Sequence, residues 1–289
     1  MPIRKPIVAG QFYESSPTEL DKQLNNCFTS KFGPGDLPLK KRTKETIGVI
    51  APHAGYEFSG PCAAWAYKEI AESKFPDTFI LLGLSHSGYP SCVSLNDWET
   101  PFGIVENDKE FGNALINSSN IPQNEEAHKS EHSIEVQLPF LQFISKDNPN
   151  KLKISPIIVS PDINPGDIAK SIHNTIKTLN KQVIVIASSD FTHFGEHYNY
   201  NPFKENIKEN LYKLDKTAID QIINLNSYRF LDHIQQTGAT ICGKYPIAAI
   251  IELSNLLNAK KARLLHYYTS GDIINNYSSA VGYGAISIE

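Results

Sequence analysis

The chain has 289 residues, 20% of them charged, and its formal net charge is −4. This balance leaves no broad basic field, which argues against a nucleic-acid duplex or an anionic membrane as the main partner. No Gly/Ser-rich or Pro-rich tract divides the chain, so we expect a single domain over residues 1–289.

The four cysteines are scattered: Cys27, Cys62, Cys92 and Cys242 form no Cys-x-x-Cys pair. Neither a disulfide framework nor a structural zinc site is expected from such spacing. The apolar runs are all shorter than the roughly 20 residues that span a bilayer. The basic start of the chain is not followed by a hydrophobic signal core. We therefore expect a soluble protein of the reducing cytoplasm.

The predicted elements alternate between helix and strand. The first helix begins after Ser16, an N-cap residue type, with Pro17 at its first position, and runs to about Phe28. Further helices are predicted over residues 59–72, 108–116, 134–144, 165–179, 206–223, 228–236 and 240–257. Short strands are predicted over residues 91–95, 97–100, 152–159, 263–270 and 280–288. This alternation predicts an α/β fold, a three-layer α/β/α sandwich with a mostly parallel or mixed central sheet.

Three further strands each end in a loop that carries a histidine. The apolar run 46–51 precedes His53, the run 78–84 precedes His86, and the run 183–187 precedes His193. Continuous apolar runs of this length are typical of strands covered on both faces. Ligands of open α/β sheets bind outside the carboxyl ends of the strands. The recurrence therefore predicts a functional crevice lined by these histidines.

Cys242 has an electrostatic reason to ionise if Thr240 caps the helix predicted from that residue. In the first helical turn, free amides and the positive end of the helix dipole stabilise a thiolate. The alternative is a small buried apolar residue, the common fate of free cysteine, and the sequence leaves both open for Cys242. The other three cysteines are expected to be buried.

Imidazole and thiolate together suit zinc, copper or iron, although no short metal-binding motif links His53 and His86. Asp190, three residues before His193, is close enough in sequence to orient that imidazole or raise its basicity. His132 either lines the same crevice or caps the start of a helix, where Ser130 and Ser133 are the other candidate caps. Other candidates for lining a pocket are Arg4, Gln11, Tyr13, Tyr56 and residues 270–272.

Six stretches in order resemble the Memo family. They are PIVAGQFY (6–13), APHAGY (51–56), GLSH (83–86), EHSIE (131–135), SSDFTH (188–193) and TICGKYP (240–246). The match covers essentially the whole chain, and the ordered set is far more specific than any one piece. The family is similar in fold to the class III extradiol dioxygenases, which are non-haem iron enzymes with an α/β/α core.

The resemblance implies that His53, His86 and Cys242 are metal ligands and that His193 corresponds to the acid/base histidine of those dioxygenases. The thiolate stands where the dioxygenases use a carboxylate, which shifts the preference of the site towards softer metals and adds an oxidisable ligand. Fe(II) is the expected metal, with copper as the alternative and zinc as a substitute.

The resemblance also bears on partners. Prokaryotic members are often called protein B of a radical-SAM-associated (AmmeMemoRadiSam) system, so proteins of that system are candidate partners, beside a small-molecule or peptide ligand in the crevice. Eukaryotic members resemble signalling effectors with redox activity. Phe12 stands where the eukaryotic form has tryptophan, and residues 57–59 differ too.

Three function classes follow. The first is a mononuclear metal-dependent redox protein, a dioxygenase-like oxidoreductase in which His193, oriented by Asp190, moves protons, with His132 nearby. The second is a metal-free enzyme with Cys242 as nucleophile and His193 or His53 as base. The third is a binding or adaptor protein that uses the crevice for a ligand without turnover.

Overall fold

A computed structural model of the chain describes residues 2–39 and 41–289. Its strands are β1 (Ile3–Arg4), β2 (Gly48–Ala51), β3 (Thr78–Gly83), β4 (Cys92–Val93), β5 (Asp97–Thr100), β6 (Gly103–Asn107), β7 (Lys153–Ile158), β8 (Val183–Ser188), β9 (His193–Gly195), β10 (Ala262–Thr269) and β11 (Ser279–Ile288). They join in one sheet with the order β1-β5-β6-β7-β3-β8-β2-β11-β10, to which β4 and β9 add at β7 and β11.

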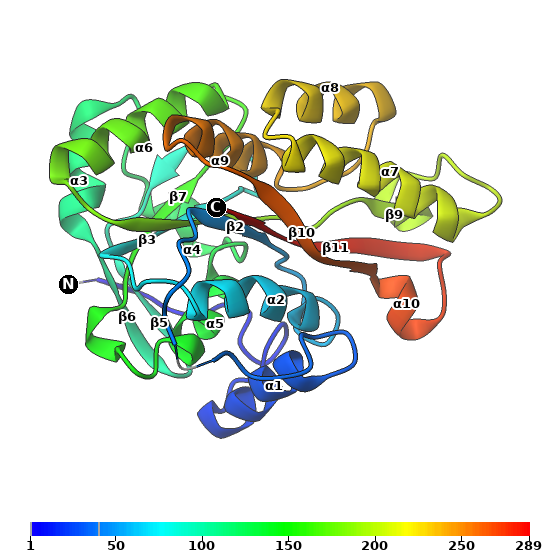
Figure 1. Cartoon of the computed structure of the whole chain (residues 1–289), viewed down its shortest axis with the longest axis horizontal. Coiled ribbons are helices and arrows are strands. Elements are labelled where there is room, and N and C mark those ends of the chain that lie inside the picture. Colours follow the sequence, from blue (N-terminus) through cyan, green and yellow to red (C-terminus); the bar gives the residue numbers. More distant parts are fainter. Residues whose placement is uncertain (1, 40) are drawn as a thin grey trace.

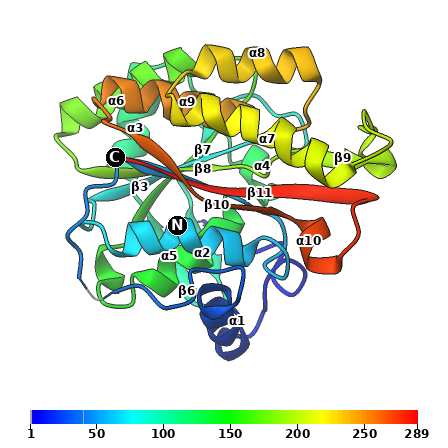
Figure 2. The ribbon, with the colours of Figure 1, turned by 45° about the vertical axis from the view of Figure 1, so that its right-hand side comes forward.

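The α-helices cover both faces of this sheet. They are α1 (Pro17–Thr29), α2 (Gly60–Ala71), α3 (Lys109–Ser118), α4 (Glu125–Lys129), α5 (Leu138–Ile144), α6 (Pro165–Leu179), α7 (Ile207–Ile223), α8 (Ser227–Thr237), α9 (Lys244–Leu256) and α10 (Ser270–Ile274). Figure 1 shows α3, α6, α7, α8 and α9 on one side of the sheet and α1, α2 and α5 on the other, and Figure 2 shows the same layers after a turn of 45°. The predicted three-layer α/β/α sandwich is confirmed.

The three histidine-bearing strands lie side by side in the parallel centre of the sheet. Strand β8 pairs in parallel with β2 on one side and β3 on the other. The register places Ala51 of β2 opposite Ser188, and Leu82 of β3 opposite Ala187. All three strands therefore end at the same level, and the loops that follow them start together. The two late strands, β10 and β11, are antiparallel.

Burial on both faces explains the continuous apolar runs of the central strands. In β2, Val49 and Ala51 belong to the core beneath α1, α2 and α5, while Ile50 between them belongs to the core beneath α6 and α9. All three side chains are fully buried. A strand with two buried faces has no polar face to alternate with, so its run of apolar residues is unbroken.

The stretch predicted as one helix over 134–144 is divided. A 3₁₀ turn over Glu135–Gln137 precedes α5, and Pro139, which has no backbone N–H, lies in the first turn of α5. Ser133 does not cap this helix, because its hydroxyl donates to the carbonyl of Leu84 beyond β3. Among the described residues, none of the helices has the length and apolar character needed to cross a membrane.

Candidate metal centre

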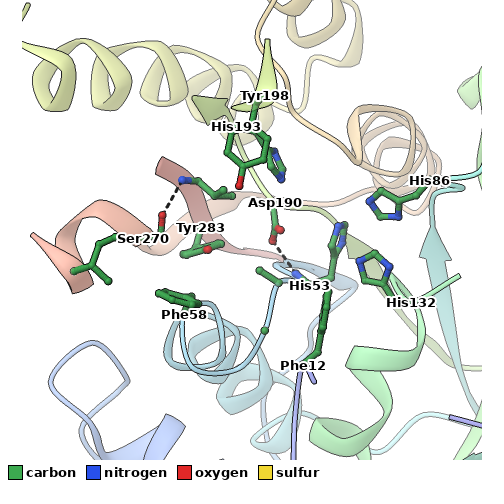
Figure 3. A pocket seen from close by; sticks show the side chains of 14 residues that line it. Phe12, His53, Phe58, His86, His132, Asp190, His193, Tyr198, Ser270 and Tyr283 are labelled. Atoms are coloured by element: carbon green, nitrogen blue, oxygen red, sulfur yellow. Dashed lines mark hydrogen bonds between the residues drawn. The ribbon is translucent and has the colours of Figure 1, made fainter. Parts of the chain in front are cut away.

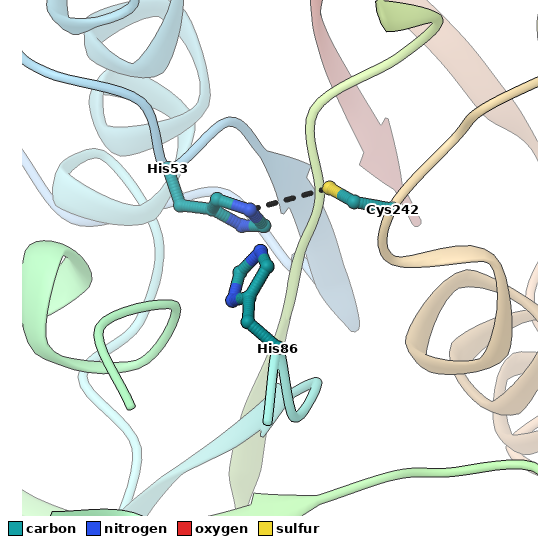
Figure 4. A group of neighbouring side chains, drawn as sticks. All are labelled: His53, His86 and Cys242. Carbon is teal, nitrogen blue, oxygen red and sulfur yellow. Dashed lines mark hydrogen bonds between the residues drawn. The ribbon is translucent and has the colours of Figure 1, made fainter. Parts of the chain in front are cut away.

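Three donor atoms converge beyond the ends of β2, β3 and β8. His53 follows β2, His86 follows β3, and Cys242 comes from the loop between α8 and α9 (Figure 4). One donor atom from each of the three lies within 4.8 Å of the others. The Cys242 Sγ and the His53 Nε2 are 3.2 Å apart. Sequence positions 189 residues apart are thus brought to hydrogen-bond distance.

His53 is held at its backbone and at its ring. Its backbone N–H donates to Asp190 Oδ1 at 2.8 Å, and its Nδ1 lies 2.9 Å from the Ser188 hydroxyl oxygen. Because Nδ1 is engaged by the protein, Nε2 is the nitrogen that faces Cys242. Burial lowers the pKa of His53 well below its ordinary value, which favours the neutral imidazole that binds metal ions.

His86 is held in the same way by a carboxylate. Its Nδ1 lies 2.9 Å from Glu131 Oε1, and its backbone N–H donates to Oε2 at 2.7 Å. Burial opposes the ionised form of Glu131, but the hydrogen bonds from His86 and from the backbone of Ser133 lower the pKa of Glu131 to about 2. Metal-bound histidines commonly donate their other ring nitrogen to such a partner.

Glu131 supports the ligands but is itself poorly placed to bind a metal ion. Its oxygens also lie close to the nitrogens of His86 and His132, so these three residues form a second cluster of donor atoms. Oε1, however, accepts the backbone N–H groups of His132 and Ser133, each at 2.8 Å, in addition to the His86 ring. Oε2 accepts the backbone N–H of His86 at 2.7 Å, so both oxygens of Glu131 are already engaged by protein donors.

Cys242 reaches the centre from a loop, which corrects the expected helix start. Helix α9 begins at Lys244 with Gly243 as its N-cap, so Cys242 lies outside the first turn and Thr240 does not cap the helix. A Cβ at Gly243 would lie 2.4 Å from Ser189 Cβ and 2.5 Å from the Ser188 carbonyl oxygen. Only glycine lets this loop approach the end of β8 so closely.

The thiol is therefore not ionised by a helix N-terminus. Its sulfur accepts the backbone N–H of Asp190 at 3.3 Å. Burial, followed by the nearby Asp190 carboxylate, nevertheless raises the pKa of Cys242. A thiolate at this position needs a cation beside it, and the two imidazoles present one place for that cation.

His193 and Asp190 both face the centre, but Asp190 does not orient His193 as expected. The His193 Nδ1 lies 3.1 Å from the carbonyl oxygen of Thr240, and the Thr240 hydroxyl bridges the His193 backbone N–H and carbonyl. The Asp190 carboxylate instead accepts the backbone N–H of His53. Thr240 thus fixes the ring of His193, with Nε2 left for a bound ligand.

His53, His86, Asp190 and His193 line a pocket of about 370 Å³ (Figure 3). His132 lines this pocket, which was one of the two roles expected for it. Its ring stacks on that of His86, with 4.4 Å between the ring centroids, and lies edge-on to Phe12 at 4.9 Å. The rest of the lining is mainly aromatic or apolar, with three hydroxyl groups, those of Tyr198, Ser270 and Tyr283. Its other large side chains are Phe12, Phe58, Ile274 and Val281.

Of the other residues proposed for the pocket, Ser270 lines it. Arg4 and Tyr13 are instead buried against Glu135, and the Tyr56 hydroxyl donates to the carbonyl of Val136. Gln11 lines a separate smaller hollow. The polar N-terminal residues thus hold the wall that carries Phe12 in place and do not face the metal centre.

Asp272 has a supporting role as well. Its carboxylate closes the N-terminal capping box of α10 with Thr269 and accepts the hydroxyls of Tyr212 and Tyr277. These contacts hold the short helix that presents Ser270 to the pocket.

Sequence reasoning missed the residues that hold the ligands. Ser188 reads as the last residue of a buried strand, and Gln137 as part of an amphipathic helix. Both are almost fully buried. A buried glutamine has to find hydrogen-bond partners, but the sequence does not tell that it is buried. Phe58, Tyr198 and Tyr283 also went unpredicted, because aromatic residues in a sequence are usual members of the core.

Comparison with known proteins identifies the relatives of this chain. The family model described as Memo-like protein matches residues 4–287. The chain belongs to the Memo family. It is 39% identical over 290 residues to the MEMO1 family protein MK0963 of Methanopyrus kandleri, with 98% of each chain covered. It is 40% identical over 295 residues to a MEMO1 family protein of Desulfurococcus amylolyticus, with 99% of each covered.

The fold extends beyond the Memo family. The uncharacterized protein JW3007 from Escherichia coli K12, known from a crystal structure, superposes with a TM-score of 0.55 and 9% identity. The alignment covers 85% of this chain and 100% of the other. At this identity the likeness concerns the fold alone, and the chemistry of the Memo-family chain has to be argued from its own site.

Proposed function

We propose that this Memo-family protein is a mononuclear metal-dependent redox protein whose metal is held by His53, His86 and Cys242. The observation that carries the proposal is the convergence of two imidazoles and one thiol within 4.8 Å beside a pocket. Both rings use Nδ1 for protein contacts, which is how metal-binding histidines are usually held. The donor set fits iron, copper or zinc.

Fe(II) is the first candidate metal and copper the second, with zinc as a redox-inactive substitute. A bound iron or copper ion would supply one-electron redox chemistry and Lewis acidity. A thiolate in place of a carboxylate favours the softer metal, so copper competes with iron more strongly here than at a site with two histidines and a carboxylate. The burial that raises the pKa of Cys242 would be offset by the metal charge.

His193 is the proposed acid/base residue. Its Nδ1 lies against the Thr240 carbonyl, so Nδ1 acts as a donor and Nε2 is free to accept or return a proton of a bound ligand. Asp190 and His132 complete the polar side of the pocket. We assign Asp190 to holding the His53 loop, because its carboxylate accepts that backbone N–H.

The pocket supports a small ligand with two unlike ends. One end would meet the polar side formed by His53, His86, His132 and His193, and the other would pack on Phe58, Ile274 and Val281. A volume of about 370 Å³ suits a small molecule or a single side chain of a peptide. Proteins of a radical-SAM-associated system are the proposed macromolecular partners.

A role for Cys242 as a metal ligand is favoured over a role as a metal-free nucleophile. A nucleophilic cysteine needs a lowered pKa, whereas burial and the Asp190 carboxylate raise the pKa of Cys242. A stoichiometric reaction of Cys242 with a small electrophile, at the same rate with and without chelator, would reverse this preference. A binding protein without turnover would retain the metal and consume no O2 in the presence of reductant and a panel of phenols and catechols.

The deciding experiment is elemental analysis of protein purified anaerobically without chelators, together with His53→Ala and Cys242→Ser variants. We expect about one equivalent of iron or copper in the wild type and loss of most of it in both variants. His173→Ala, in α6 on the outer side of the sandwich, is the matched control and should keep the metal. Metal retained by both site variants, or none bound by the wild type after anaerobic reconstitution, would overturn the proposal.

A further inference from the structure

The hydroxyl of Ser188 has three polar neighbours in the protein interior. The carbonyl oxygen of Ser133 lies at 2.6 Å, Gln137 Nε2 at 2.8 Å and His53 Nδ1 at 2.9 Å. Ser133, Gln137, Ser188 and His53 are all 2% exposed or less. A hydroxyl oxygen has one hydrogen and two lone pairs, so these three neighbours use its whole hydrogen-bonding capacity.

Two backbone carbonyls determine the direction of each bond. The Ser133 carbonyl can only accept, so it takes the single hydrogen of Ser188. The side-chain atom of Gln137 that lies 3.0 Å from the Pro52 carbonyl has to be a donor, which identifies it as the amide nitrogen. The Tyr67 hydroxyl donates to the amide oxygen of Gln137 at 2.7 Å, in agreement with that orientation.

One lone pair of Ser188 then remains, and it faces His53. Gln137 donates into the first lone pair, so the second can be used only if His53 Nδ1 carries a hydrogen and donates it. We propose that Ser188, braced by Gln137 and the Ser133 carbonyl, is a positioning residue that fixes His53 in the Nδ1–H tautomer and directs its Nε2 lone pair at Cys242. The link to metal binding rests on the proposed function.

The opposite tautomer would be penalised at Nδ1 and would be unable to bind a metal ion at Nε2. Its Nδ1 lone pair would face the lone pair of Ser188 at 2.9 Å, unless Ser188 withdrew its hydrogen from the Ser133 carbonyl at 2.6 Å. Its Nε2 hydrogen would occupy the side that faces Cys242 Sγ at 3.2 Å, where a metal ion would bind. An unpaired buried acceptor is costly, so the network selects one tautomer.

The two histidine ligands are thus held by different chemistry. Glu131 fixes His86 with a charge, whereas a neutral hydroxyl fixes His53. A second carboxylate in the place of Ser188 would add negative charge next to Asp190, which already accepts the His53 backbone N–H. The neutral Ser188 hydroxyl fixes the tautomer of His53 without placing a second negative charge beside Asp190.

The direct test is long-range ¹H–¹⁵N NMR of protein labelled at histidine nitrogen, recorded metal-free and with Zn(II). In both forms of the wild type, Nδ1 of His53 should be protonated and Nε2 not. In metal-free Ser188→Ala the Nε2–H form should become populated, and Zn(II) and Fe(II) affinity should fall about 10–100-fold. Ser188→Thr, which keeps the hydroxyl, should restore both the Nδ1–H tautomer of His53 and the affinity for Zn(II) and Fe(II).

Two further variants separate positioning from folding. Ser155→Ala removes a buried hydroxyl of β7 that has no hydrogen-bond partner within the described part of the chain, and it should change neither tautomer nor affinity. Gln137→Met removes one donor to Ser188 but leaves its hydrogen on the Ser133 carbonyl, so a folded variant should keep His53 in the Nδ1–H tautomer. A protonated His53 Nε2 in the metal-free wild type, or unchanged tautomer and affinity in Ser188→Ala, would overturn the inference.

The failure of this inference and that of the proposed function are distinguishable. The tautomer of His53 is measured on metal-free protein, so it stands or falls independently of metal binding. A wild type with the Nδ1–H tautomer but no affinity for Fe(II), copper or Zn(II) would overturn the proposed function and leave the positioning role of Ser188 in place.

Discussion

Glu131 binds His86 at two points, because Oε2 accepts the backbone N–H at 2.7 Å and Oε1 lies 2.9 Å from Nδ1. One carboxylate, 45 residues further along the chain, therefore fixes both the loop and the ring of a proposed metal ligand. Glu131 is in turn held by the backbone N–H groups of His132 and Ser133. The protein alone holds these donor atoms in place, so the proposed ligands would lose little freedom on binding a metal ion.

Replacing Glu131 by glutamine should weaken metal binding without removing a ligand. The amide nitrogen of glutamine would face backbone N–H donors at one of the two oxygen positions, and the His86 ring would lose its charged partner. We expect a loss of about 10–100-fold in Fe(II) or Zn(II) affinity, measured by competition with a chelating dye. Glu126→Gln on the exposed side of α4 is the control, and equal affinities for the two variants would contradict the role given to Glu131.

A methyl group at Gly243 should displace Cys242. The added Cβ would lie 2.4 Å from Ser189 Cβ and 2.5 Å from the Ser188 carbonyl oxygen, and neither group can move away without shifting the end of β8. We expect Gly243→Ala to lose most of its metal and about 1–3 kcal/mol of unfolding free energy. Gly166→Ala, near the start of α6, is the control. A fully metallated Gly243→Ala variant would show that the close approach of this loop is not required.

The buried ion pair of Arg4 and Glu135 should contribute far more to the free energy of unfolding than the surface ion pair of Lys5 and Glu99. Their side chains are 3% and 0% exposed, whereas those of Lys5 and Glu99 are 70% and 34% exposed. Arg4→Met would leave a buried, uncompensated carboxylate and should cost about 3–5 kcal/mol. Lys5→Met should cost about 0–1 kcal/mol. Urea denaturation of both variants measures the difference, and similar midpoints would refute it.

Arg4 also ties the N-terminal segment to the metal centre. Its guanidinium donates to the carbonyls of Glu131 at 2.6 Å and His128 at 3.2 Å. Loss of these bonds frees the segment that positions His86. We therefore expect Arg4→Met, but not Lys5→Met, to weaken metal binding as well.

Asp215 should make the protein less stable as the pH rises. This fully buried carboxyl group accepts the hydroxyls of Thr192 and Tyr267, yet burial raises its pKa to about 6. Between about pH 4, where an unfolded aspartate ionises, and pH 6, the folded state binds more protons, so raising the pH favours unfolding. The unfolding free energy of the wild type relative to Asp215→Asn should fall by about 3 kcal/mol from pH 4 to pH 7.

The measurement is a series of denaturation curves across this pH range. Asp220→Asn, on the exposed side of the same helix, controls for the loss of a carboxylate. A wild-type curve parallel to that of Asp215→Asn would show that the carboxyl group is ionised at no cost in the folded protein.

His193 should be dispensable for the metal and needed for turnover. It contacts Thr240 and is not one of the three converging donors. His193→Gln should keep about one metal per chain while its rate of O2 consumption with reductant falls about 10²–10⁴-fold, as for the loss of a general acid/base. Elemental analysis measures the metal content, and an oxygen electrode measures the rate of O2 consumption. Loss of metal in this variant would instead make His193 a ligand.

The local sequence was sufficient for the parts of this protein that depend on neighbours in the chain. The alternation of helices and strands predicted the layered fold, and the apolar runs of β2, β3 and β8 with the histidines that follow them predicted the edge of the sheet where the candidate site lies. Their period and composition carry this information because a strand covered on both faces has to be apolar throughout. The ordered motifs gave the family and its expected ligands.

Only the tertiary structure decided how the ligands are held. Ser188, Gln137 and Glu131 support His53 and His86 across 45 to 135 residues of sequence, and Thr240 replaces Asp190 as the partner of the His193 ring. The helix start expected at Thr240 was wrong because the loop has to extend to Lys244 so that Cys242 can reach β8. Hydrogen bonds between distant segments depend on which polar groups become buried together, and that is set by packing and not by local pattern.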